Sequence, residues 1–281
     1  GMDRKKKQVI SVITMTALLI GIIIIALHLG TIKVPVLGGL QSIWQGLGIP
    51  VTVTAPLEPE QEAVLWYIRM PRILVGLMVG ASLALAGAVM QGIFSNPLAD
   101  PGIMGVSAGA SLGAVIAISL GLTSLGMFYM PMFAFIGAFA AVSITILLTM
   151  RGGRVETATL LLAGVAISML LGAFTSGILT LMNEYRLREF LFWMVGGLDF
   201  RRWEHVFLAI GPFLIGTTIL ITFGRQLNVL VLGDTEAKVL GVPVMLYRLI
   251  FLFLASFITA TAVCVSGAIG FVGLIIPHIV R

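Results

Sequence analysis

The chain has 281 residues, of which 59% are hydrophobic and only 10% are charged, and its mean hydropathy is +1.11. A soluble domain of this length needs a polar exterior, so the composition excludes that class and indicates a polytopic membrane protein. Lysines and arginines flanking a bilayer explain the formal net charge of +5 better than nucleic-acid binding does, and the single cysteine, Cys264, excludes an intrachain disulfide and a cysteine metal cluster.

The amino-terminal part of the chain begins with a charged cluster at 3–7 and continues with an uncharged run at 8–29. A signal peptide has a shorter apolar core and a cleavage site after it. We therefore expect a first membrane span instead, with residues 1–7 in the cytoplasm. Residues 30–66 are predicted to form an external loop because prolines and glycines interrupt them, with a short interfacial helix around 41–48.

The next stretch predicts two buried helices joined by a stiff turn. Arg69 and Arg72 flank Pro71, an uncharged run follows at 73–99, and prolines break the pattern within 96–102. Small residues recur at four-residue spacing on both sides of this break, at Gly76, Gly80, Gly109 and Gly113. In a bilayer, such residues let helix backbones approach closely.

The rest of the chain alternates between apolar runs and two polar segments. Spans are expected as two helices within 101–150, then at 157–183, 206–224 and 249–280, the last as one full helix plus a short broken one. Residues 184–205 mix charges with aromatic side chains and are predicted to be an external amphipathic segment, while 225–248 form a polar cytoplasmic loop. The prediction is an all-α, polytopic membrane helical bundle that forms one domain over 1–281, with about seven full spans.

Several stretches together resemble the FecCD-type permeases, which are the membrane subunits of ABC importers for iron-siderophores, haem and vitamin B12. The matching stretches are 69–110, 160–167, 192–199, 232–244 and 266–281. The resemblance implies the type II ABC importer permease fold. Since members of that family have about ten spans, it also implies that this chain stops inside the eighth helix.

The stretch LGDTEAKVLG resembles the cytoplasmic coupling loop of that family, which consists of two short helices that dock into a cleft of the ATPase subunit. The residues that fall on the motif are Gly233, Asp234, Ala237, Leu240 and Gly241. A polar loop with glycine at both ends, between two spans, suits this role without the family. The alternative is an ordinary solvated loop.

Two further sets of residues match functional positions of the family. Arg69 and Arg72 match arginines that pair with acidic residues of a substrate-binding protein on the outer face; the alternative is that they anchor the helix at lipid headgroups. Asn96 and Leu98 match an inner constriction, and Thr157 matches a second gating stretch. The alternative for Asn96 is a turn residue that bonds its own backbone.

Other chemistries find no support in the sequence. The three histidines are isolated, so no metal site is expected, and no acidic residue lies mid-span, which argues against a secondary transporter driven by an ion gradient. No Gly-Lys dipeptide exists, so there is no Walker A loop, and no nucleophile and base pair suggests an intramembrane enzyme. We expect no catalytic residues and no cofactor, with ATP hydrolysed on a separate subunit.

The sequence thus predicts the permease of an ATP-driven importer for an iron-siderophore-type chelate, with vitamin B12 or haem as the alternative cargo. The implied partners are ABC ATPase subunits at the cytoplasmic face, an extracellular or periplasmic binding protein, and a second permease copy or close paralogue. The lipid bilayer is the expected surroundings and nucleic acid is not a partner. The expected location is the cell membrane, with a cytoplasmic amino terminus.

Overall fold

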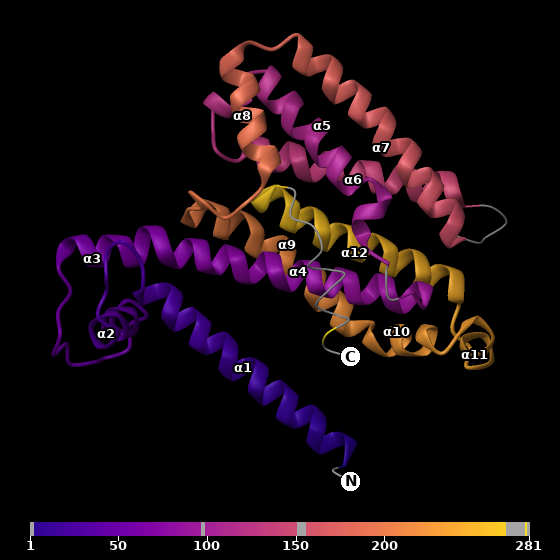
Figure 1. The fold of residues 1–281 in the computed structure, drawn as a ribbon. Helices are drawn as coiled ribbons and strands as arrows, with labels where there is room; N and C mark the ends of the chain where they lie inside the picture. Colours follow the sequence, from indigo (N-terminus) through magenta and orange to yellow (C-terminus); the bar gives the residue numbers. More distant parts are fainter. Residues whose placement is uncertain (1–2, 97–98, 151–155, 268–278, 280–281) are drawn as a thin grey trace. The chain divides into compact units, whose positions relative to one another are not determined.

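The computed structural model describes residues 3–96, 99–150, 156–267 and 279, and within these ranges it contains helices and no strand (Figure 1). The all-α prediction is confirmed. Among the described residues six helices are long and apolar enough to cross a membrane: Arg4–His28, Pro59–Phe94, Tyr129–Thr149, Ala158–Thr180, Trp203–Thr222 and Val244–Ser266. The predicted broken helix at the carboxyl end lies outside the described residues.

The chain forms two compact units, Gly1–Val75 with Asp199–Trp203, and Gly76–Leu198 with Glu204–Arg281. The first unit contains α1 (Arg4–His28), α2 (Val36–Gly46), α3 (Pro59–Ala63), a π-helical turn and the start of α4 (Met70–Phe94). The single permease domain expected over 1–281 stays a prediction.

The segment predicted as an external loop is well ordered by side-chain hydrogen bonds. Gln41 on α2 donates from Nε2 to Thr54 Oγ1 at 2.9 Å, and its Oε1 accepts from two backbone amides that follow. Trp66 donates to the Ser42 hydroxyl at 3.0 Å. The long helix begins at Pro59, whereas the sequence predicts that the loop continues to residue 66. A capping box formed by Glu58 and Gln61 allows this earlier start, because it satisfies the first backbone amides of the helix.

The second unit is built around a close contact between α5 (Val106–Ser119) and α6 (Tyr129–Thr149). A Cβ added to Gly109 would meet the Gly137 carbonyl, one added to Gly137 would meet the Gly109 carbonyl, and one added to Gly113 would meet the Phe133 carbonyl. The prediction that Gly109 and Gly113 allow close backbone approach is confirmed. On α4, by contrast, a Cβ at Gly80 would meet no described atom within 4 Å.

The helix α5 is shorter than the span predicted there. A 3₁₀ turn at Pro101–Met104 and Gly105, with φ of 85°, precede it and take up part of the apolar run. The turn is held in place because Thr145 on α6 donates to the Met104 carbonyl at 3.0 Å. The prolines within 96–102 predict a break here, but not that it continues to Gly105 and shortens α5.

The remaining helices of this unit are α7 (Thr157–Thr180), α8 (Glu184–Val195), α9 (Trp203–Thr222, whose first residue belongs to the first unit), α10 (Gly224–Val231), α11 (Asp234–Val239) and α12 (Val244–Ser266). The side chain of Arg186 on α8 donates to the Ser119 carbonyl at the end of α5, at 2.8 Å. Phe190 and Trp193 are buried and Phe192 is exposed, so α8 is amphipathic, as its sequence predicts.

Candidate functional site

Two short helices, α10 and α11, connect α9 to α12 in the segment predicted to be a coupling loop (Figure 1). Gly233 caps α11 with φ of 121°, and Gly241 follows α11 with φ of 77°. Both values lie in the region that favours glycine, which explains why glycine stands at both ends of this element. The two-helix form expected from the resemblance is therefore present.

The side chains of α11 and its neighbours divide into an anchored face and an open face. Ala237 is fully buried, whereas the side chains of Val239 and Leu240 are 82% and 61% exposed. Exposed apolar side chains on a polar loop are typical of a surface that a protein partner covers. Among the five motif residues, Asp234 carries the one ionisable side chain, and it forms an ion pair with Arg248, with its Oδ1 2.7 Å from the Arg248 Nη2.

A cavity of about 330 Å³ brings this loop together with the predicted gate. Its walls come from Ser95 at the end of α4, Glu156 before α7, Gly233 and Asp234 of the loop, and Arg248 of α12. Glu156 directly precedes Thr157, and Ser95 directly precedes Asn96. Ser95 and Glu156, the neighbours of two predicted gate residues, therefore lie beside the predicted coupling loop. The sequence predicted the gate and the coupling loop as separate features.

The turn after α4 is sharp and bonded to its own backbone. Ser95 has φ of 50°, the Asn96 amide donates to the Gln91 carbonyl at 3.2 Å, and the Asn96 carbonyl accepts from Ala99. Asp100 accepts from the Gly102 amide at 3.0 Å, which starts the 3₁₀ turn. These are bonds of the backbone, so the gate role of Asn96 and its alternative, a side chain that bonds its own backbone, both stay predictions. Leu98 lies outside the described residues, and Thr157 is described only as the first residue of α7.

The two predicted docking arginines have different surroundings, both within the first unit. Arg69 donates from Nη1 to the Leu27 carbonyl in the last turn of α1, at 2.9 Å, and from Nη2 to the Ile32 carbonyl in the loop that follows α1. Arg72 is half-exposed and its Nη2 lies 3.0 Å from Asp199 Oδ1. Arg69 is thus used to hold α1, a role that favourable charge at a helix carboxyl end supports, while Arg72 faces solvent.

The loop that carries Asp199 adds a second cation. Arg201 donates from Nε to the Asp199 carbonyl at 3.2 Å. Burial lowers the pKa of Arg201, and the charge of Asp199 opposes this with a smaller effect. Because the ordinary pKa of arginine is very high, Arg201 stays protonated.

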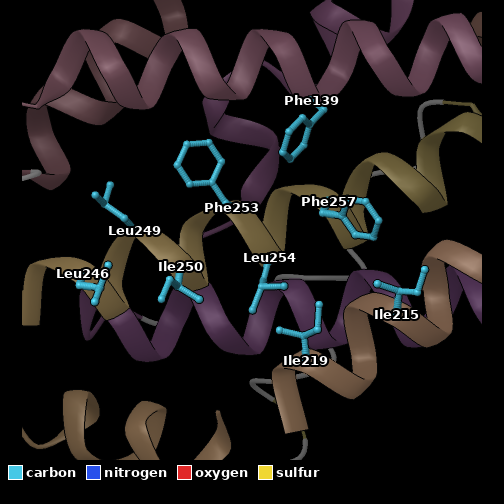
Figure 2. Close-up of a pocket in the computed structure, with 9 residues that line it drawn as sticks. All are labelled: Phe139, Ile215, Ile219, Leu246, Leu249, Ile250, Phe253, Leu254 and Phe257. Atoms are coloured by element: carbon cyan, nitrogen blue, oxygen red, sulfur yellow. The ribbon is translucent and has the colours of Figure 1, made fainter. Parts of the chain in front are cut away.

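An apolar groove lies between α6, α9 and α12, with a volume of about 370 Å³ (Figure 2). Figure 2 shows aliphatic and phenyl side chains turned into it, among them Phe139, Ile219 and Phe253. The lining offers no polar side chain that could orient a cargo. Such a wall suits lipid chains or another helix, so we assign no substrate to it.

The cavity beside the coupling loop is lined by two charged residues that were not predicted as functional from the sequence, Arg248 and Glu156. Their only local signal is that each stands at the boundary of a span. Arg248 pairs with Asp234, and Glu156 lines the same cavity as both of them. Within the described ranges no group of histidine, cysteine or acidic residues could hold a metal ion.

Known proteins resemble this chain along most of its length. A family model described as the FecCD transport family matches residues 18–281. The cobalamin import system permease protein of Halobacterium salinarum is 44% identical over 256 residues, covering 89% of this chain and 68% of that protein. The hemin transport system permease protein of Yersinia pestis is 42% identical over 217 residues, which cover 76% of this chain and 65% of that protein. A solved structure described as an inward-facing conformation of a metal-chelate type ABC transporter has a TM-score of 0.80 at 32% identity, covering 95% of this chain and 79% of that chain.

Proposed function

This chain belongs to the FecCD transport family and is the permease of an ABC importer, and we propose that its cargo is a metal tetrapyrrole of the cobalamin or haem type. The family match over residues 18–281 is the observation that carries the function. The chain is a multi-pass membrane protein and is not itself an enzyme. In this proposal it works in the cell membrane with separate ATPase subunits, a binding protein and a second permease copy or paralogue.

The relatives support the choice of cargo. The Halobacterium relative is named for cobalamin and the Yersinia relative for hemin, and both compounds are metal ions held in a large tetrapyrrole ring. An iron-siderophore, which the resemblance suggested first, is the second candidate. It is kept because the similar solved structure is described only as a metal-chelate type transporter.

The experiment is uptake by the complete transporter, reconstituted in proteoliposomes with its ATPase and binding protein. Radiolabelled cyanocobalamin, hemin and a ferric hydroxamate siderophore are offered one at a time, with ATP or with a non-hydrolysable analogue inside. We expect ATP-dependent uptake of one of the first two. Uptake of the siderophore alone would overturn the tetrapyrrole assignment, and uptake that follows an ion gradient without ATP would overturn the importer class.

The coupling role of the α10–α11 loop is part of the same proposal. Gly233, Asp234, Ala237, Leu240 and Gly241 would form the element that docks on the ATPase, with the exposed side chains of Val239 and Leu240 as its contact surface. Asn96, Leu98 and Thr157 would form the gate next to it. A short stiff turn suits a gate because it moves together with its helices.

A further inference from the structure

Arg248 is the least exposed charged group of the cavity beside the coupling loop. It lies in the second turn of α12, and its side chain is only 15% exposed, compared with 54% for its partner Asp234. The Nη2 to Oδ1 distance is 2.7 Å, and the buried Nε atom has no hydrogen-bond partner among the described residues. An arginine in this setting depends on its one carboxylate, because a buried charge without a partner is strongly unfavourable.

The helix that carries Asp234 has few other attachments. It contains six residues, its one buried side chain is Ala237, and glycines with positive φ stand at both of its ends. Glycine allows the backbone on each side to change direction at little cost. Within α11, the burial of Ala237 and the ion pair of Asp234 with Arg248 on α12 are therefore the side-chain features that help to fix its orientation.

The other end of the link lies in the core. Beyond Arg248, α12 is buried along most of its length, with Phe251, Leu252 and Ala255 fully covered. The same cavity is lined by Ile93 and Ser95 at the end of α4 and by Glu156 before α7. A displacement of α11 can thus reach α12 through one short polar contact, beside a cavity that the turn after α4 also lines.

From this geometry we infer that Arg248 is a positioning residue, which joins the coupling helix α11 to α12 through Asp234 and transmits ATPase-driven movement to the transport pathway. This inference rests on the proposed function. The pair acts as one unit: losing either charge removes the side-chain link between α11 and α12. In such variants, fewer of the ATP-hydrolysis cycles that take place would move cargo.

The test is a double-mutant cycle in the complete reconstituted transporter, with cyanocobalamin and hemin as the cargo probes. Asp234→Asn, Arg248→Gln and the double variant are compared by the ratio of cargo transported to ATP hydrolysed. We expect each single variant to lower the ratio by about tenfold and the double variant to lower it no further, since the two residues share one interaction. Asp234→Glu, which keeps the carboxylate, should retain most of the ratio.

Two further variants separate coupling from stability. Arg188→Gln breaks the 2.6 Å ion pair with Glu184 on α8, whose side chains are both mostly exposed, and should keep the wild-type ratio. If Arg248→Gln does not accumulate, Arg248→Lys keeps the charge with fewer donors and should give an intermediate ratio. An unchanged ratio in Asp234→Asn and Arg248→Gln or Lys, or additive losses in the cycle, would overturn the inference. Absence of ATP-driven transport by the wild type would instead refute the proposed function.

Discussion

Arg69 and Arg72 lie close together on one continuous helix, yet their guanidinium groups have different tasks. Arg69 donates to two backbone carbonyls, in the last turn of α1 and in the loop that follows it, so its removal leaves those carbonyls without their partners. Arg72 forms an exposed pair with Asp199. Exposed pairs contribute little stability, about 0 to 1 kcal/mol, so Arg72 can exchange its partner for a carboxylate of another protein. The predicted docking of a binding protein therefore rests on Arg72, while Arg69 holds α1 against the long helix that carries both arginines.

Docking of the binding protein tests this difference between the two arginines. Arg72→Glu should weaken binding about tenfold, and the loss should be larger at low ionic strength, where charges are less screened. Asp199→Asn should have the opposite effect and strengthen binding, because it frees Arg72 from its internal partner. The measurement is the affinity of the purified binding protein for the reconstituted transporter at two salt concentrations.

The matched control for docking is Arg72→Lys, which keeps the positive charge and should retain most of the affinity. Arg69→Gln should instead lower the thermal unfolding midpoint of the permease. Equal affinity of the wild type and Arg72→Glu would remove Arg72 from the interface.

At the scale of elements, α5 can pack closely against α6 only because glycines stand at the contact, whereas Gly80 on α4 has no close neighbour among the described atoms. Gly109 and Gly137 each face the backbone of the other helix, with no room for a methyl group. Gly80 repeats the same sequence spacing on α4 but faces open space among the described atoms. The four-residue spacing cannot distinguish Gly109 from Gly80. It indicates that another helix could pack closely at these positions, but not whether one does.

The two glycine positions give opposite expectations for the same substitution. Gly109→Ala should destabilise the permease by about 1–3 kcal/mol, because the added methyl group must displace the α6 backbone. Gly80→Ala should be neutral or stabilising by up to about 1 kcal/mol, since alanine favours a helix. Thermal unfolding of the detergent-solubilised variants measures both. Equal effects of the two substitutions would contradict the close contact at Gly109.

For the whole molecule, the question is whether the short helix α5 crosses the bilayer. Its 14 residues give about 21 Å of rise. The 3₁₀ turn of four residues before it adds about 8 Å, which together approach the thickness of about 30 Å of a hydrocarbon core. If α5 crosses, the amino terminus and the α10–α11 loop lie on the same side. If it does not, they lie on opposite sides.

Cysteine accessibility decides this. In a Cys264→Ser background, Lys6→Cys and Lys238→Cys should both react with a membrane-impermeant maleimide only in inside-out vesicles, as positive residues near the first span predict. Glu184→Cys, on α8, should react only in right-side-out vesicles. Labelling of positions 6 and 238 from opposite faces would refute the crossing of α5, and labelling of position 238 from outside would refute the cytoplasmic position of the coupling loop.

The sequence by itself determined the helical class, the order of apolar and polar segments, and the break after α4. These features follow from hydropathy, proline and glycine, which act within a few residues. Only the tertiary structure decided that Arg69 holds the end of α1, that Arg248 pairs with Asp234, and that Ser95 and Glu156 line one cavity with the coupling loop. Each depends on which distant groups meet when helices pack, and a local pattern carries no record of its partner.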